Sequence, residues 1–105
     1  KNMKKLILKN KGKFTDEASS RYEANVDNKF KVRIYKDNYY EKGFVFEFLT
    51  IKNIPLTLIT SDFLSSFWSK ATKKDAVKRV TEIINDTECY NRILKYATYE
   101  NNNPR

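Results

Sequence analysis

The sequence predicts an α+β fold: a small antiparallel sheet of three to five strands within residues 4–60, followed by two or three helices within residues 61–99 that pack on one face of the sheet. Hydrophobic residues alternate with polar ones in the first part of the chain, and recur at helical spacing in the second part. The 105 residues, 40% of them hydrophobic, are the length of one domain and can bury a core. We therefore expect residues 1–105 to be a single domain whose ends, 1–3 and 101–105, fray.

The first half of the predicted sheet follows from short hydrophobic runs. Residues 4–9 suit a short first strand, and period-two alternation then predicts strands at residues 22–26 and 30–34. Asp27 and Asn28 separate the last two runs, and both residue types favour tight turns. The two runs are therefore expected to form a hairpin.

The second half of the sheet is predicted from a strongly apolar run. Residues 44–51 are hydrophobic on nearly both faces, so this segment is expected to be the central strand, covered on two sides. Pro55 then opens a fourth strand at residues 56–59, where the missing N–H of proline is tolerated at an edge or at the first residue.

Three helices are predicted, each from a capping residue followed by hydrophobic residues at helical spacing. The first is capped by Ser61 and Asp62, the second by Thr72 with Asp75, which is close to a capping box, and the third by Thr87. The residues expected on their buried faces are, in order, Phe63, Leu64, Phe67 and Trp68; Ala76, Val77, Val80, Ile83 and Ile84; and Tyr90, Ile93, Leu94 and Ala97. If the first helix is peripheral, Phe63, Phe67 and Trp68 form instead an exposed apolar patch, which usually marks a partner site.

The composition excludes several classes of protein. The chain has no histidine and only one cysteine, Cys89, which excludes His-based triads, internal disulfides and Cys-rich zinc sites. No run approaches the roughly 20 apolar residues that span a bilayer. We therefore expect no enzymatic activity, no metal, no cofactor and no membrane partner, and a location in the cytoplasm of a bacterial host cell. The abundance of Lys, Asn, Ile and Tyr, whose codons are A/T-rich, indicates a low-GC bacterium or its mobile elements.

The formal charge of +8 points to an anionic partner, and two sets of residues are candidates for contacting it. The partner- or anion-binding candidates are Lys70, Lys73, Lys74, Lys78 and Arg79, of which Lys70, Lys74 and Lys78 are four apart and are expected to share one helix face. The nucleic-acid candidates are Lys4, Lys5, Lys9, Lys29, Lys31, Arg33, Tyr35, Tyr39 and Tyr40, because cations and aromatics on one sheet face suit phosphates and bases. Both sets are also explained by charged side chains that simply face solvent and contact no partner.

The predicted register gives Arg33 a second interpretation. Pairing the hairpin with the next strand places Arg33 opposite Glu47, and a three-residue turn sets Glu23 beside it, which makes a surface cross-strand ion pair. Glu47, Arg33 and Tyr35 are also the only coherent trio for a His-free ribonuclease-type toxin, which is the remote alternative.

The favoured function is a non-catalytic accessory binding protein. It would be a small inhibitor or modulator from a phage or mobile element, of the anti-CRISPR or replication-blocking type, docking on the acidic or phosphate surface of a host nucleic-acid-processing complex. This comparison is one of profile alone, since no motif here matches a known family. The alternative is a direct nucleic-acid-binding protein. The split of the cations among acid-containing segments favours the first hypothesis, because a DNA groove usually concentrates them.

Overall fold

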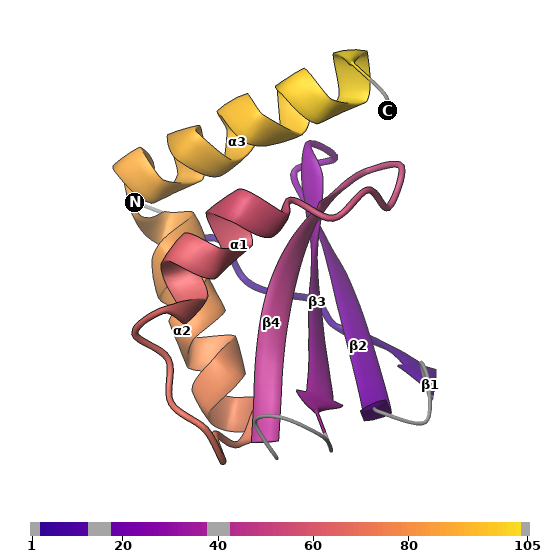
Figure 1. The fold of residues 1–105 in the computed structure, drawn as a ribbon, viewed down its shortest axis with the longest axis vertical. Helices are drawn as coiled ribbons and strands as arrows, with labels where there is room; N and C mark the ends of the chain where they lie inside the picture. The colour runs from indigo at the N-terminus through magenta and orange to yellow at the C-terminus, as the bar shows by residue number, and fades with distance from the viewer. Residues whose placement is uncertain (1–2, 13–17, 38–42, 104–105) are drawn as a thin grey trace.

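A computed structural model describes residues 3–12, 18–37 and 43–103 of the chain. From the N-terminal end, the elements are β1 (Lys9–Gly12), β2 (Ala18–Val26), β3 (Phe30–Asp37), β4 (Gly43–Thr50), α1 (Thr57–Leu64), α2 (Lys73–Asn85) and α3 (Thr87–Asn102). The four strands form one antiparallel sheet in the order β1-β2-β3-β4, and the helices pack against one of its faces (Figure 1). The predicted α+β class is therefore confirmed.

The hydrophobic core lies between the covered face of the sheet and the helices. Phe48 is at its centre, because its ring makes edge contacts with the rings of Phe30, Phe46 and Phe63 at centroid distances of 6.1, 5.8 and 5.7 Å. Edge-to-face contacts of this kind add to the free energy of burying the rings. The alternation read in β2 and β3 thus corresponds to one buried face and one face that the helices leave uncovered.

The hairpin between β2 and β3 forms as predicted. Asp27 and Asn28 both have left-handed backbone conformations, with φ of 55° and 56°, and the N–H of Lys29 donates to the carbonyl of Val26 at 2.9 Å. Both strands are longer than the hydrophobic runs that predict them.

The predicted strand at residues 4–9 is wrong in position, because β1 begins only at Lys9. Residues 4–8 are held instead by the side chain of Asn85. Its Oδ1 accepts from the backbone N–H of Lys4 at 2.7 Å, and its Nδ2 donates to the Lys4 carbonyl at 2.9 Å. An amide side chain on α2 thus takes the place of a neighbouring strand, and Leu6 and Leu8 pack against the core.

β4 is an edge strand, not the predicted central one. Its inner face is buried under the helices, and the chain that follows it folds back along its outer edge. The bonds run from Phe44 N to Ala71 O (2.7 Å), from Phe48 N to Thr60 Oγ1 (3.0 Å), from Thr50 N to Ile54 O (2.9 Å) and from Leu56 N to Phe48 O (2.8 Å). The connecting segment therefore satisfies groups that an uncovered edge would expose.

The predicted fourth strand at residues 56–59 is also wrong, because these residues open α1. Pro55 makes a single isolated bridge with Leu49, and the helix begins at Thr57. Leu56, Ile59, Thr60 and Phe63 are all buried, and their spacing of three and four residues is that of a helix face. Tertiary burial of this face overrides the strand preference of the β-branched residues.

The helix starts are partly as predicted. Thr72 and Asp75 form a capping box, with Asp75 N donating to Thr72 Oγ1 at 3.1 Å and Thr72 N donating to Asp75 Oδ2 at 2.8 Å. α1 begins before the predicted Ser61 and Asp62. α3 is capped by Asp86, whose carboxylate accepts from the Cys89 N–H, and not by Thr87.

The Thr60 hydroxyl on the Phe48 amide gives a test of the edge closure. Thr60→Val keeps the shape of the side chain but leaves the Phe48 N–H without its partner, so we expect the free energy of unfolding to fall by about 1–3 kcal/mol. The matched control Thr57→Val changes an exposed residue of the same helix and should stay within about 0.5 kcal/mol of the parent. Urea unfolding of both variants measures the difference, and equal effects would contradict this role of Thr60.

Candidate functional site

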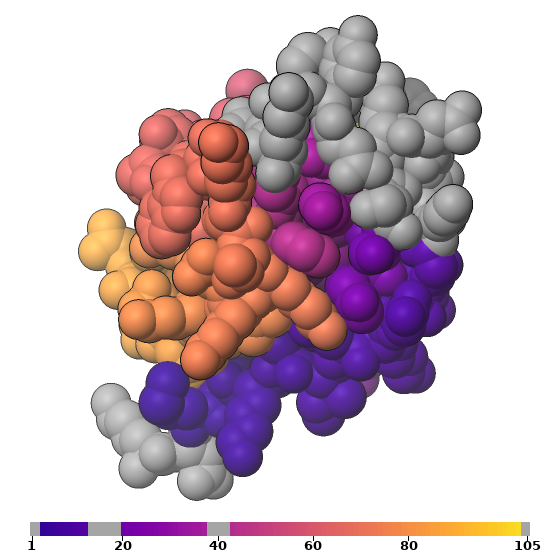
Figure 2. Space-filling model, turned by 90° about the horizontal axis from the view of Figure 1, so that it is seen from below, coloured from indigo at the N-terminus to yellow at the C-terminus, as the bar shows by residue number. Residues whose placement is uncertain are grey.

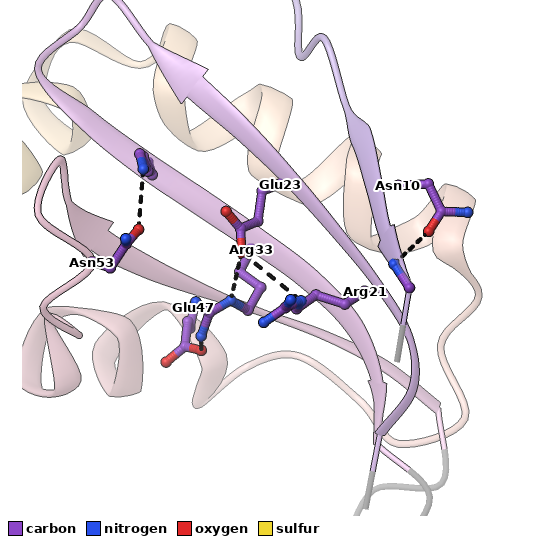
Figure 3. A network of polar contacts seen from close by, with 8 residues as sticks. Asn10, Arg21, Glu23, Arg33, Glu47 and Asn53 are labelled. Carbon is purple, nitrogen blue, oxygen red and sulfur yellow. Dashed lines mark hydrogen bonds and ion pairs between the residues drawn. The ribbon is translucent and has the colours of Figure 1, made fainter. Parts of the chain in front are cut away.

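The uncovered face of the sheet carries a compact ion network centred on Arg33. The guanidinium lies between the carboxylates of Glu23, at 3.3 Å, and Glu47, at 2.9 Å, and Arg21 Nε is 3.9 Å from Glu23 (Figure 3). The register that places Arg33 opposite both Glu23 and Glu47 is as predicted. Arg33 is only 8% exposed. It is therefore a cross-strand structural cation rather than one presented to a ligand.

Tyr35 adjoins this network but is poorly suited to proton transfer. Burial, reinforced by the charges of Glu47 and Asp37, raises its pKa to about 12. The phenol therefore stays neutral at physiological pH. The trio Glu47, Arg33 and Tyr35 is brought together, but the charge of Arg33 is compensated by two carboxylates, so the geometry gives the ribonuclease alternative no support.

Lys4 joins three parts of the fold. Its ammonium is 3.8 Å from the carboxylate of Asp27 and lies 4.7 Å from the ring centroid of Tyr90. The Tyr90 hydroxyl donates to the same carboxylate at 2.8 Å, and burial together with this bond raises the pKa of Tyr90 to about 12. Lys4 therefore connects the N-terminal segment with the hairpin turn and α3.

The remaining nucleic-acid candidates divide into three groups. Lys5 and Lys29 are exposed at the surface, and Tyr39 and Tyr40 lie outside the described residues. Lys9 and Lys31 converge with Lys11 on a hollow of about 420 Å³ that is also lined by Ile7, Glu23 and Asn25; we call it the sheet hollow. Lys31 Nζ donates to Asn53 Oδ1 at 3.1 Å. Of these remaining candidates, the structure brings together only Lys9 and Lys31.

The partner-binding candidates gather around the start of α2 (Figure 2, orange). The predicted stripe of three lysines on one helix face is wrong for Lys70, which lies in the loop before the Thr72 cap with a φ of 63°. Lys74 and Lys78 are exposed on α2. Lys73 is turned toward the sheet, and its Nζ lies 3.8 Å from the ring centroid of Tyr22.

Trp68 is the residue that the sequence misplaces. It was expected in the core, but α1 ends at Leu64, and Trp68 is 60% exposed beside Phe67, with the ring centroids 5.2 Å apart. The sequence could have indicated this exposure only through the end of the helix, because α1 stops at Leu64, before the apolar spacing does, and Trp68 follows it. Phe67 and Trp68, with Asp75, Lys78, Arg79 and Glu82, line a hollow of about 190 Å³.

Asp75 contributes a fixed negative charge to this second hollow. The hydrogen bond from the Thr72 backbone N–H lowers the pKa of its carboxyl group. The carboxylate is therefore ionised at physiological pH and is already engaged in the capping box. The five candidate cations nevertheless outnumber Asp75 and Glu82, so the surface remains basic.

Neither a metal site nor a membrane span is found in the part of the chain that the structure describes. No group of three or more Asp, Glu or Cys side chains there could hold a metal ion. None of the described helices is both long and apolar enough to cross a bilayer. Burial raises the pKa of the Cys89 thiol. Comparison with protein families, curated proteins and solved structures finds no match for this chain.

The Arg33 network gives a stability prediction. Arg33→Met leaves two partly buried carboxylates without their shared cation, so we expect the free energy of unfolding to fall by about 1–3 kcal/mol. The same change at Arg92, whose ion pair with Asp62 is exposed, should cost at most about 1 kcal/mol. Urea unfolding of both variants measures this, and an equal or larger loss for Arg92→Met would contradict the role given to Arg33.

The two raised tyrosine pKa values predict a loss of stability in alkali. Tyr35 and Tyr90 keep their protons to about pH 12 in the folded chain, whereas an unfolded chain releases them near pH 10. Above pH 10 the unfolded state therefore binds fewer protons, and the free energy of unfolding falls as the pH rises toward 12. Tyr35→Phe and Tyr90→Phe should each flatten this decline in urea unfolding. A decline that is equally steep in both variants would contradict the assignment.

Proposed function

We propose that this chain is a non-catalytic binding protein that docks on an acidic protein surface. The contact would be made by the Trp68 surface, which consists of Trp68, Lys70, Lys73, Lys74, Lys78 and Arg79. The observation that carries the proposal is the exposure of Trp68 next to a hollow lined by two of these cations. Tryptophan and arginine dominate the binding energy of protein interfaces, because they combine a large apolar area with polar groups.

The Trp68 surface is held in place from both ends. The backbone of Lys70 packs directly on Gly43, where an added Cβ would lie 2.6 Å from the Lys70 Cα, and Phe44 N donates to the Ala71 carbonyl at 2.7 Å. On the other side of Trp68, the Phe67 ring packs against Phe46 at 5.3 Å. A surface that is already ordered loses less conformational entropy when a partner binds.

The charges of this surface favour an acidic partner. Cations near the start of a helix oppose the helix dipole, and Lys74 and Lys78 repel one another at a spacing of four residues. Within the isolated chain the Tyr22 ring contacts Lys73, and Asp75 attracts Lys74 and Lys78, but cations remain in excess on this surface. An acidic surface turns the same charges into an attractive field that raises the rate of association.

Such docking suits a small inhibitor or modulator of the phage or mobile-element type, acting in the bacterial cytoplasm on a nucleic-acid-processing complex. The support for this setting is the length of the chain, its basic charge and its abundance of residues whose codons are A/T-rich. The acidic protein component of the complex is the partner that the Trp68 surface fits.

Trp68 is the only tryptophan, so its fluorescence reports directly on the proposed contact. We expect a glutamate- and leucine-rich peptide to shift the emission to shorter wavelength, and a peptide with glutamine in place of glutamate to leave it unchanged. The triple variant Lys70→Glu, Lys74→Glu, Lys78→Glu should keep the fold, melt at an equal or higher temperature, and bind the acidic peptide about tenfold more weakly.

The matched control is Lys9→Glu, Lys11→Glu, Lys31→Glu, which changes the net charge equally but at the sheet hollow, which Trp68 does not line. It should lose less than about threefold in peptide affinity, since only long-range attraction is altered. Equal losses in the two triple variants, or an emission that does not move with the acidic peptide, would overturn the proposal.

A further inference from the structure

The sheet hollow collects cations from two strands that are not neighbours. Lys9 and Lys11 belong to β1 and Lys31 to β3, with β2 between them. Strands lie about 4.8 Å apart, so these lysines bracket β2 at a separation of about 10 Å. They are far apart in the sequence, and only the pairing of the strands brings them to one concave surface.

The positive charge of this hollow is not cancelled by its acidic wall. Among the described residues that line it, Glu23 has the only carboxylate, which is already engaged by Arg33 at 3.3 Å and lies 3.9 Å from Arg21. Lys31 donates to the amide of Asn53, which is uncharged and therefore does not offset the positive charge of the lysine. Lys9 and Lys11 are exposed, and neither forms an ion pair with any residue that the structure describes.

We infer that the sheet hollow binds the phosphate backbone of a nucleic-acid strand. The Lys ammonium is a compact point charge on a flexible stem and suits phosphates at variable positions. Neutralising phosphates with lysines releases counterions, which gives binding that depends on salt and not on base sequence.

The composition of the hollow favours a nucleic acid over a protein. None of the described residues that line it is Trp, Tyr, Phe or Arg, and its one large apolar residue, Ile7, is a lone side chain that is 78% exposed. A protein interface of stable affinity needs aromatic or arginine side chains that become buried when the partner binds. Lysines contact phosphates and do not stack on bases, so we place the contact at the backbone of the strand.

The site is separate from the Trp68 surface and does not depend on the proposed function. Lys9 and Lys11 are on β1, at the edge of the sheet opposite β4, where Trp68 lies beside Val45. Lys31 is on β3, next to β4, but it pairs with Leu49, which is roughly 13 Å along β4 from Val45. Both surfaces can therefore be occupied in one molecule, which would place a nucleic-acid strand and an acidic protein on either side of the chain.

The test measures fluorescence anisotropy of labelled single-stranded oligonucleotides of unrelated sequence over a series of salt concentrations. We expect similar affinities for all sequences. The variant Lys9→Glu, Lys11→Glu, Lys31→Glu should bind at least about tenfold more weakly, and the slope of log K against log salt should shrink by about 2, the value for three phosphate contacts on a single strand. The milder Lys→Gln triple variant should show the same slope change, which guards against an effect of misfolding.

The control variant is Lys70→Glu, Lys74→Glu, Lys78→Glu, which has the same net charge. It should lose less than about threefold in oligonucleotide affinity and keep the parental salt slope. Equal losses in both triple variants would overturn the inference, because net charge alone would then explain binding. Competition by polyglutamate as effective as that by the unlabelled oligonucleotide would also overturn it. Failure of the Trp68 emission test leaves these outcomes untouched, so the two proposals fail separately.

Discussion

The fold depends on the closure of the outer edge of β4 by the segment that follows it. An edge strand with as much hydrophobic surface as β4 would otherwise present unpaired backbone groups to other chains. The return of residues 54–71 along this edge satisfies those groups, while α2 and α3 help to bury the inner face of the strand. It also fixes where α1 lies against Phe48, and it places the Ala71 carbonyl and the loop before it. The position of Trp68 and Lys70 at the surface is thus a consequence of how the sheet edge is protected.

The features of the fold that depend on local chemistry were predictable from the sequence. The turn at Asp27 and Asn28, the pairing of Arg33 with Glu23 and Glu47, and the capping box before α2 each follow from a few neighbouring residues. The errors at residues 44–51 and 56–59 have different causes. Hydrophobic residues on both faces of a strand indicate a central position in the sheet, but an edge strand covered by the segment that follows it has the same pattern. At residues 56–59 a short run after Pro55 suits a strand, and the helical spacing becomes clear only with Thr60 and Phe63 beyond that run.

The sequence identifies which candidate residues are charged, but it does not show which of them lie together on one accessible surface. Net charge and runs of lysine identify which residues are cationic, yet the tertiary structure decides which of them remain available. Lys4 is equivalent to Lys9 in the sequence, but Asp27 engages it in the fold, whereas the enclosure of Arg33 by two glutamates follows from the predicted register. Trp68 was misassigned because helical spacing was extended past the end of α1. The spacing of Phe63, Phe67 and Trp68 fits both a buried stripe and an exposed patch, and the end of α1 decides between the two.

The contact between Asn85 and Lys4 also bears on the order in which the chain can assemble during synthesis. Lys4 and Asn85 are separated by 81 positions, so the hydrogen bonds of the Lys4 backbone cannot form until the end of α2 has been synthesised. The Lys4 ammonium can meet Asp27 earlier, but its contact with the Tyr90 ring has to wait until α3 has begun. The hairpin of β2 and β3, whose contacts are local, can form long before this. The segment around Lys4 is therefore fixed in place only after the hairpin, although it is translated before it. Its docking requires that the end of α2 and the start of α3 are already in position.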